Sequence, residues 1–402
     1  MKTVAIISEY NPFHTGHEYQ IAKIREEFGE DTRIIAIMSG NYTQRGEIAV
    51  MDKSTRAKTA VLCGINLVLE IPFPYSASSA EFFAESGVKI ANEIGVVDYL
   101  SFGSECGNLN ELVSVAENMT TDEYRLVLRD SSATRDLGYP ELCEKVYKEL
   151  FNKEISKDFF TPNNILAIEY LKALIRQRSK ITPHTLARIG SSYSDDSVTD
   201  AAHQSASAIR KLLSTDFDSA MNFVPKVTVS TLTDEYCNGL FPTDAERLAP
   251  ALISHLRLNS PAPNTKIHDA AGGLYNRLYN ASFNADTISS LILLAATKKY
   301  TTARIRRALW YSFFGVTSSN VKELPLYTQV LAMDDVGKTI LKEVKKISDF
   351  PVVTKPSDSS RLSPEAKLQK ELADKADSIF HLTKPNPPSG ATSLLTTPYV
   401  MK

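Results

Sequence analysis

The sequence contains few cysteines and no long apolar run. Only four of its 402 residues are cysteines, and no two of them form a C-x-x-C pair. We therefore expect reduced thiols in the core, and neither a disulfide framework nor a zinc ribbon. No segment approaches the ~18 consecutive apolar residues of a membrane span, and Glu9 and Asn11 interrupt the first apolar run too early for a signal peptide. The sequence thus predicts a cytoplasmic protein that makes no membrane contact.

The sequence also lacks an excess of charge of one sign and the two common nucleotide-binding fingerprints. The formal net charge is -2, so any contact with nucleic acid has to rest on a local basic patch. Composition alone neither supports nor excludes an RNA partner. No G-x-G-x-x-G follows the first apolar run, and no G-x-x-x-x-G-K-[ST] occurs anywhere. These absences count against a dinucleotide-dependent oxidoreductase and a P-loop NTPase.

What the sequence does contain is an alternation of short apolar runs with segments of helical periodicity. The apolar runs lie at residues 4–7, 33–38, 66–71 and 98–102, and residues 185–189 are a further candidate strand. Strands joined by helical crossovers of this length form a mainly parallel sheet with right-handed connections. We therefore predict an α/β fold of Rossmann type. Ligands of such sheets bind beyond the carboxyl ends of the strands, here at residues 8–14, 39–47 and 103–105.

The rest of the chain divides into three predicted parts. Residues 109–181 are mostly helical and form an insert in an N-terminal domain that spans residues 1–222, with residues 223–231 as the exit from it. Residues 223–380 form a mainly helical C-terminal domain that ends in a short mixed segment. Residues 381–402 include a stretch rich in proline and serine and are predicted to be a disordered tail.

The first loop, between the run at residues 4–7 and the helical period that starts at His17, is suited to an anion. Thr15 and Glu18 have the spacing of a capping box, which makes Thr15 the expected N-cap. A helix N-terminus presents unpaired N–H groups and the positive end of the helix dipole. His14 and His17 flank this end and can donate hydrogen bonds to phosphate oxygens, while Gly16 keeps the backbone clear. The alternative is two incidental histidines, or half of a metal site at helical spacing.

A second helix start lies at residues 203–211. Ser205 and Ser207 suit the first turn of a helix, and Arg210 lies within reach of the same end. These three residues are candidate phosphate contacts.

Together these motifs resemble a known family. Residues 11–17, Asn-Pro-Phe-His-Thr-Gly-His, are similar to the H-x-G-H signature of the nucleotidyltransferase and class I aminoacyl-tRNA synthetase superfamily, and residues 205–210 look like its second phosphate-binding motif. The closer resemblance is to the bacterial tRNA(Met) cytidine acetate ligase family. It is carried by residues 9–17, 38–47 (Met-Ser-Gly-Asn-Tyr-Thr-Gln-Arg-Gly-Glu), 66–72, 102–105 (Phe-Gly-Ser-Glu) and 162–166 (Pro-Asn-Asn-Ile-Leu), and more loosely by residues 328–341.

The resemblance implies a Rossmann-like nucleotidyltransferase sheet with a helical insert, followed by a mainly helical C-terminal domain. It also implies an enzyme that activates acetate with ATP as acetyl-adenylate and releases pyrophosphate. The acetyl group would then be transferred to N4 of the wobble cytidine in elongator tRNA(Met). Attack of a carboxylate on the α-phosphate needs in-line positioning and stabilisation of phosphoryl charge, which donors at a helix end supply. Mg²⁺ is an expected companion of the phosphates, although no carboxylate cluster in the sequence identifies a metal site.

The resemblance further implies which residues contact ATP. His14 and His17 are the expected catalytic residues. The expected ATP contacts are Ile7, Ser8, Glu9, Tyr10, Asn11, Pro12, Phe13, His14, Thr15, Gly16, His17, Glu18, Tyr19, Gln20, Gly103, Asn163 and Arg188. Asn163 could instead be an ordinary N-cap and Gly103 a turn glycine.

Cations that could neutralise pyrophosphate form a separate set. Arg188, Arg210 and Lys53 are the candidates, and the alternative for each is a surface salt bridge.

A basic stretch in the second half is a candidate RNA contact. Residues 298–311 carry Lys298, Lys299, Arg304 and Arg307 among aromatic residues. Clustered basic side chains contact phosphates, and aromatic side chains stack on splayed bases. The alternative is a solvated helix face whose aromatic residues belong to the core. A weaker basic candidate comprises Lys172, Arg176, Arg178 and Lys180.

Two other functions stay open at this point. One is a small-molecule adenylyltransferase or acid-amine ligase of the same superfamily. The other is a non-catalytic RNA-binding protein that responds to ATP. The acetate-tRNA ligase is the leading hypothesis because the motifs of the first half match it in combination.

Overall fold

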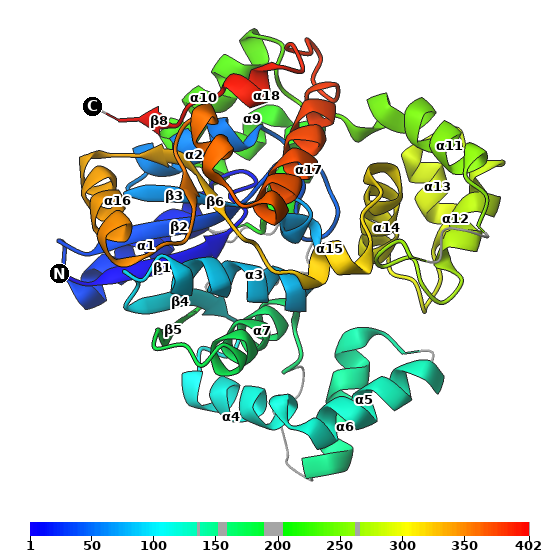
Figure 1. The fold of residues 1–402 in the computed structure, drawn as a ribbon, viewed down its shortest axis with the longest axis horizontal. Coiled ribbons are helices and arrows are strands. Elements are labelled where there is room, and N and C mark those ends of the chain that lie inside the picture. Colours follow the sequence, from blue (N-terminus) through cyan, green and yellow to red (C-terminus); the bar gives the residue numbers. More distant parts are fainter. Residues whose placement is uncertain (135–136, 152–158, 189–203, 262–265, 402) are drawn as a thin grey trace.

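A computed structural model describes residues 1–134, 137–151, 159–188, 204–261 and 266–401. Within these residues eight strands form one sheet in the order β5-β4-β1-β2-β3-β6-β7, with β8 paired to β6 (Figure 1). Their bounds are Thr3–Ser8 (β1), Arg33–Ser39 (β2), Leu67–Ile71 (β3), Tyr99–Ser104 (β4), Thr182–Ala187 (β5), Thr328–Met333 (β6), Val352–Val353 (β7) and Tyr399–Val400 (β8).

The first five strands are parallel to one another, as the alternation of runs predicts. β1 pairs with both β2 and β4, so the chain order reverses beside β1. Ligands of doubly wound sheets bind at such a reversal, in the crevice outside the carboxyl ends of the strands. The runs at residues 4–7, 33–38, 66–71 and 98–102 are confirmed as strands. β5 begins three residues before the expected run at 185–189, and Ile189 lies outside the described residues.

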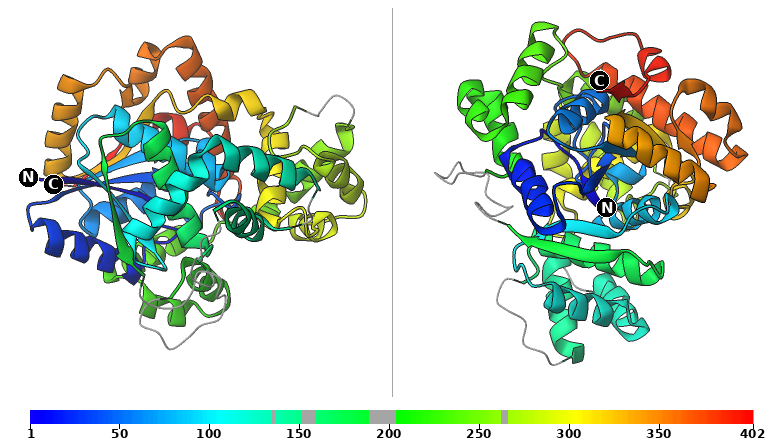
Figure 2. Two further views of the ribbon diagram at one scale, coloured as in Figure 1. Left: turned by 90° about the horizontal axis from the view of Figure 1, so that it is seen from below. Right: turned by 90° about the vertical axis from the view of Figure 1, so that its left-hand side faces the viewer.

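Helices cover both faces of this sheet, seen edge-on in the right panel of Figure 2. α1 (Thr15–Phe28) and α2 (Lys53–Leu62) lie on one face, where Ile21, Ile24 and Ala57 pack against strand residues such as Val4 and Ile6. On the other face lie α3 (Ala80–Glu93), α4 (Leu109–Thr120), α7 (Pro162–Arg176) and α16 (Asp335–Ile347). Strand residues alternate between the two cores because successive side chains point to opposite faces.

The chain returns to the sheet near its C-terminus. β6 runs antiparallel to β3, β7 and β8 are parallel to β6, and Met401 N donates to Met333 O at 2.9 Å. The segment predicted to be a disordered tail thus contributes β8 and the short helix α18 (Thr392–Leu395). The proposed division at residues 222 and 380 stays a prediction, but residues from both sides of residue 222 share this sheet.

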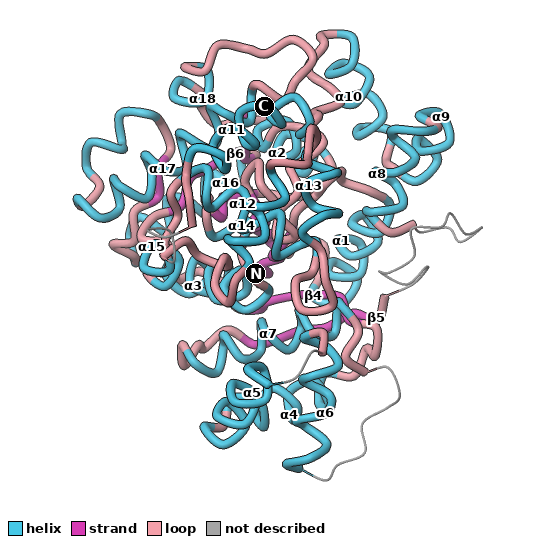
Figure 3. Tube along the Cα trace, turned by 90° about the vertical axis from the view of Figure 1, so that its right-hand side faces the viewer, coloured by secondary structure: helices cyan, strands magenta, loops and turns pink. Residues whose placement is uncertain are grey.

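In the described ranges, three helical groups surround the sheet. The insert after α4 consists of α5 (Asp122–Thr134) and α6 (Tyr139–Phe151), at the bottom of Figure 1. A second apolar core is built from α11 (Ala249–Leu258), α12 (Leu274–Ser282), α13 (Ile288–Ala295), α14 (Thr302–Phe314), α15 (Ser318–Lys322) and α17 (Pro364–His381). The third group, at the upper right of Figure 3, is α8 (Ala206–Thr215), α9 (Phe217–Ala220) and α10 (Lys226–Cys237).

The expected exit from the first domain overlaps α10. This helix packs against α2, where Thr59 Oγ1 donates to Thr231 Oγ1 at 3.3 Å. Short 3₁₀ turns lie at Tyr75–Ala77, Met221–Phe223, Ala245–Leu248 and Pro356–Arg361. In the part of the chain that the structure describes, no helix is both long and apolar enough to cross a membrane.

Candidate active site

The loop after β1 ends in a helix cap formed by a histidine. His14, not Thr15, is the N-cap of α1: its Nδ1 accepts a hydrogen bond from Gly16 N at 3.1 Å. His17 Nδ1 in turn accepts from His14 N at 3.1 Å, which completes a capping box made of two imidazoles. The prediction that Thr15 caps the helix is therefore wrong by one residue, because an imidazole nitrogen does the work of the usual cap oxygen.

These two hydrogen bonds define the protonation of both rings. A nitrogen that accepts an N–H carries no hydrogen of its own, so each neutral ring holds its hydrogen on Nε2. The rings stack with their centroids 3.7 Å apart. An added Cβ on Gly16 would lie 2.9 Å from His14 Cε1, so only glycine allows this ring to fold over the helix start. Both histidines are thus arranged as Nε2–H donors at a helix N-terminus.

His17 stays neutral over the physiological pH range. Burial lowers its pKa to about 3, with a further contribution from the positive charge of Arg188. Tyr10 and Phe13 pack against the ring, with centroid separations of 4.8 Å and 5.2 Å. The neutral ring can stabilise the negative charge that develops on a phosphoryl oxygen by donating a hydrogen bond from its N–H group.

Two adjoining cavities meet at this pair of histidines. His14, His17 and Arg188 line both cavities. The smaller cavity, of about 70 Å³, is also lined by Gly16, Tyr19, Gln20, Gly103, Leu186, Ala187 and Gln204. The larger cavity, of about 140 Å³, is also lined by Ile7, Ser8, Glu9, Tyr10, Asn11, Thr43, Gln44, Arg45, Glu47, Phe83, Asn163, Leu166, Tyr170, Ala206, Ser207 and Arg210. We call the two cavities together the cleft.

The structure therefore brings most of the expected ATP contacts to one place. Four residues of the predicted segment do not line the cleft, namely Pro12, Phe13, Thr15 and Glu18. Phe13 is fully buried in the core under α1. The cleft lies beside β1 and β4, where the strand order reverses, as expected for a doubly wound sheet.

The end of β4 and the start of α7 hold each other in place at the cleft. Glu105 accepts hydrogen bonds from Asn163 Nδ2 at 2.6 Å and from Asn164 N at 2.7 Å. Asn164 Oδ1 accepts from Glu105 N at 2.9 Å. A carboxylate at the N-terminus of a helix is favoured by the helix dipole. Asn163 is therefore held by Glu105 at the wall of the larger cavity, and it is not the N-cap, which is Thr161.

Arg188 follows β5 and is exposed at the junction of the two cavities. Its backbone N donates to Ser104 O, which fixes it beside Gly103, and its guanidinium makes no ion pair with any described residue. A cation of this kind is available to an anionic ligand.

The start of α8 reaches the cleft through Arg210. Ser205 is the N-cap, whose side chain accepts from Ala208 N, whereas Ser207 and Arg210 line the larger cavity. Arg210 donates to Asn11 O at 3.1 Å and to Glu47 Oε2 at 3.0 Å. Of the three predicted phosphate contacts, two lie at the cleft and Ser205 holds the helix start.

Glu47 connects the cleft to the C-terminal helices. Its second oxygen, Oε1, accepts from Arg306 of α14 at 3.0 Å. Trp310 Nε1 donates to Gly46 O at 2.9 Å, and a Cβ on Gly46 would lie 2.7 Å from the backbone N of Arg307. Gly46 has φ of 72°, which favours glycine. The loop at residues 43–47 is therefore held between α8 and α14.

Glu9 lines the larger cavity beside this loop. One of its carboxylate oxygens, Oε1, accepts from Gln44 N at 2.8 Å. Burial raises the pKa of Glu9, while the hydrogen bond from Gln44 and the charges of Arg210 and Arg56 act in the opposite direction. The Arg56 guanidinium is buried and donates to the backbone oxygens of Glu9, Ser39, Gly40 and Met51.

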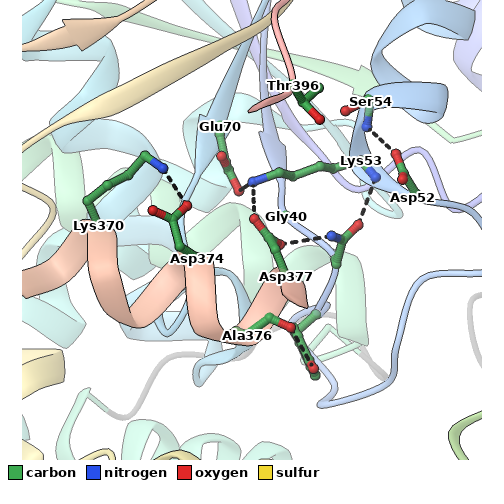
Figure 4. A network of polar contacts seen from close by, with 12 residues as sticks. Gly40, Asp52, Lys53, Ser54, Glu70, Lys370, Asp374, Ala376, Asp377 and Thr396 are labelled. Atoms are coloured by element: carbon green, nitrogen blue, oxygen red, sulfur yellow. Dashed lines mark hydrogen bonds and ion pairs between the residues drawn. The ribbon is translucent and has the colours of Figure 1, made fainter. Parts of the chain in front are cut away.

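Lys53 does not reach the cleft. Its Nζ lies 2.6 Å from both Glu70 Oε1 and Asp377 Oδ2, and the side chains are 11%, 3% and 6% exposed (Figure 4). Asp377 also accepts from Asn41 Nδ2 at 2.8 Å, and Asn41 Oδ1 accepts from Lys53 N at 2.7 Å. The suggestion that Lys53 neutralises pyrophosphate is therefore wrong. Lys53 does form salt bridges, but they are buried and not on the surface as the alternative had it, and they tie α17 to the loop after β2.

The described residues contain no group of three or more His, Cys, Asp or Glu that could hold a metal ion. Among the described residues that line the cleft, the carboxylates are Glu9 and Glu47, and Glu47 is engaged by two arginines. This donor set does not fit a metal site built by the protein alone.

The four predicted RNA contacts line one surface groove of about 480 Å³ between α3, α6 and α14. We call it the basic groove. Lys298 and Lys299 lie before α14; Arg304 donates to Asp269 O and Ala271 O, and Arg307 pairs with Asp269 at 2.6 Å.

Other parts of the basic stretches serve the fold. Tyr300, Trp310 and Tyr311 are buried, which confirms the core alternative for these aromatic residues. In the weaker basic candidate, Lys172 pairs with Glu169, and Arg176 pairs with Glu81 and Glu85.

Sequence reasoning missed several walls of the cleft. Phe83, Leu166 and Tyr170 line the larger cavity from α3 and α7. Their helical spacing predicts only that they are buried in the core. Arg56 and Arg306 were not singled out either, because a charged residue on a helix usually faces solvent. The sequence predicts that the loop at residues 39–47, which contains Glu47, lies at the carboxyl ends of the strands. It does not predict that Glu47 pairs with Arg210 and Arg306.

Comparison with known proteins places these observations in a family. The family model described as HIGH Nucleotidyl Transferase matches residues 1–392. A protein named tRNA(Met) cytidine acetate ligase from Acetivibrio thermocellus is 35% identical, with 96% of each chain covered. A protein of the same name from a Thermoanaerobacter species is 37% identical, with 92% of this chain and 93% of that protein covered.

Solved structures agree with the sequence relatives. The crystal structure of Thermotoga maritima TmcAL bound with alpha-thio ATP superposes with a TM-score of 0.91 at 28% identity, over 100% of this chain and 99% of that chain. The apo form of the same protein gives a TM-score of 0.92 at 27% identity, with both chains covered in full.

Proposed function

The chain belongs to the tRNA(Met) cytidine acetate ligase family of HIGH nucleotidyl transferases. We propose that it is an ATP-dependent, AMP-forming ligase. It activates acetate as acetyl-AMP, releases pyrophosphate, and acetylates N4 of the wobble cytidine of elongator tRNA(Met). The observation that carries the proposal is the pair of imidazoles at a helix N-terminus that line the cleft, each with its Nδ1 occupied as an acceptor so that its Nε2–H is left as a donor. The Thermotoga relative, whose crystal structure contains alpha-thio ATP, supports ATP as the substrate.

The first half-reaction requires no protein nucleophile. An acetate oxygen forms a bond to the α-phosphorus of ATP, the bond to the bridging oxygen breaks, and pyrophosphate leaves with the electron pair. His14 and His17 donate to the phosphoryl oxygens whose charge increases in the transition state. Arg188 and Arg210 balance the charge of the departing pyrophosphate, and Asn163 positions the nucleotide at the wall held by Glu105.

Mg²⁺ is proposed as a companion of ATP and not as a resident metal. The described donors do not make a protein-only site, and Mg²⁺ is commonly held mainly by substrate phosphates and water. It would supply neutralisation of phosphate charge.

The basic groove is the proposed docking surface for the tRNA. Lys298, Lys299, Arg304 and Arg307 line it, and α14 connects it directly to the cleft through the contact of Arg306 with Glu47. Basic side chains in such a groove position the RNA through its phosphates. The aromatic residues of this stretch are in the core, so base stacking by Trp310 and Tyr311 has no part in the proposal. A cytoplasmic location follows from the proposed substrate.

Transfer of labelled acetate tests the function. Wild-type protein with ATP and [¹⁴C]acetate should label unmodified elongator tRNA(Met), and a transcript whose wobble cytidine is replaced by uridine should stay unlabelled. Acetate-dependent ATP–pyrophosphate exchange without RNA labelling would support the small-molecule ligase instead. Absence of both would support the non-catalytic ATP-responsive RNA-binding protein, and either outcome overturns the tRNA ligase.

A further inference from the structure

We propose that Glu9 is the general base that accepts the proton of the cytidine N4 amine during acetyl transfer. This inference rests on the proposed function, since it concerns the second half-reaction. The lone pair of the N4 amine is delocalised into the cytosine ring, so the amine is a weak nucleophile. It becomes acidic only as its bond to the acetyl carbon forms, and a positioned base at that moment accelerates transfer by about 10²–10⁴-fold.

The two histidines cannot play this part. His14 Nδ1 accepts from Gly16 N and His17 Nδ1 accepts from His14 N, each at 3.1 Å. The remaining ring nitrogen of each carries hydrogen and has no lone pair to offer. Breaking either bond to free a nitrogen would also uncap α1. The imidazoles are therefore donors, which suits phosphate binding and excludes proton acceptance.

The described part of the cleft offers two carboxylates as alternatives. Glu47 is already fully engaged, because Oε1 accepts from Arg306 and Oε2 accepts from Arg210, both at 3.0 Å. Glu9 forms no salt bridge with any described residue, and only its Oε1 accepts a described hydrogen bond, from Gln44 N. Of the described carboxylates at the larger cavity, Glu9 is thus the one whose second oxygen is not committed to an arginine.

The surroundings of Glu9 also favour proton acceptance. Burial raises its pKa, and Glu47 acts in the same direction, while the Gln44 N–H, Arg210 of α8 and Arg56 of α2 counteract both. A carboxylate with a raised pKa is a stronger base than an ordinary one.

Acetyl transfer exchanges one acyl bond for another and moves one proton to Glu9. The N4 nitrogen forms a bond to the carbonyl carbon of acetyl-AMP, and the N4 proton passes to Glu9 Oε2. The bond between the acyl carbon and the phosphate oxygen then breaks, and AMP leaves with the electron pair. Glu9 returns its proton to water after the products depart.

Glu9→Gln separates the two half-reactions. Glutamine keeps an oxygen that can accept the hydrogen bond from Gln44 N, but its amide does not accept a proton. Hydroxylamine traps acetyl-AMP as acetohydroxamate without a protein base, so acetate-dependent hydroxamate formation measures the first half-reaction alone. Transfer of [¹⁴C]acetate to tRNA(Met) measures both. Glu26→Gln, on the exposed outer face of α1, is the matched control.

We expect Glu9→Gln to lower tRNA acetylation at least about 100-fold while hydroxamate formation falls less than about threefold. Glu26→Gln should change neither rate. Equal loss of both rates in Glu9→Gln would assign Glu9 to ATP binding or folding and overturn the inference, as would acetylation within threefold of wild type. A wild-type protein that forms no acetohydroxamate from acetate would instead overturn the proposed function.

Discussion

Replacing Lys53 by methionine should strongly destabilise the protein although Lys53 lies outside the cleft. Methionine keeps most of the length and the apolar stem of the side chain but removes the ammonium group between Glu70 and Asp377. Removing one partner of a buried ion pair leaves uncompensated charge and costs about 3–5 kcal/mol of unfolding free energy. Lys23→Met is the matched control, because the Lys23–Glu26 pair is 38% and 67% exposed and should contribute about 0–1 kcal/mol.

The loss of stability in Lys53→Met should depend on pH. Burial raises the pKa of Glu70, and Lys53 is the largest factor that lowers it, so the variant should raise that pKa further. A carboxyl whose pKa is raised in the folded state destabilises that state when ionised and ceases to do so once protonated. The difference in stability between wild type and Lys53→Met should therefore be largest near pH 8 and shrink as the pH falls toward 5.

Urea unfolding at the two pH values is the assay, with the denaturant slope checked for equality between variants. A triple variant that adds Glu70→Gln and Asp377→Asn should recover part of the lost stability, because neutral amides need no buried counter-charge. The reasoning is refuted if Lys53→Met loses less than about 1 kcal/mol at both pH values, or if the triple variant is less stable than the single one.

Three further predictions concern the cleft and the basic groove. Lys298→Glu combined with Lys299→Glu should raise the KM for tRNA at least about tenfold and leave acetate-dependent exchange unchanged; equal KM values in a titration of tRNA would exclude this docking surface. Glu47→Gln should raise the KM for ATP about three- to tenfold, measured by pyrophosphate exchange, because it loosens the hold on two arginines; an unchanged KM contradicts that role. His17, whose pKa falls from 6.5 to about 3 on folding, contributes stability that is complete above pH 6.5 and is lost as the pH falls toward 3. In His17→Gln the urea midpoint should therefore depend less on pH between 6.5 and 3 than it does in wild type. An equal pH dependence would show that His17 is not buried in its neutral form.

The parts of the fold that the sequence predicted are those encoded locally. Each parallel strand is a short apolar run, because both faces of the sheet are covered, and the first loop carries its ligand chemistry in consecutive residues. The predicted N-cap of α1, Thr15, differs by one residue from the observed N-cap, His14, because imidazole is not among the usual cap side chains.

The parts that the sequence did not predict depend on distant partners. Lys53 contacts Asp377 across 324 positions, and Arg306 contacts Glu47 across 259 positions. Nothing near either residue distinguishes it from a solvated charge. The antiparallel strand β6 likewise joins the sheet from the far end of the chain. The hydrophobic periodicity of a segment does not show with which distant segment it pairs.

The assignment of His14 as a hydrogen-bond donor to the phosphates of ATP is tested by acetate-dependent ATP–pyrophosphate exchange, measured in parallel on wild type and His14→Asn. Asparagine retains a side-chain oxygen that can cap α1 but lacks the Nε2–H group that we assign to the phosphates. We predict exchange by wild type that requires acetate, and a loss of at least about 100-fold in the variant with an unchanged urea midpoint. Exchange at the wild-type rate in a folded His14→Asn protein would show that His14 does not donate to the phosphates during acetate activation.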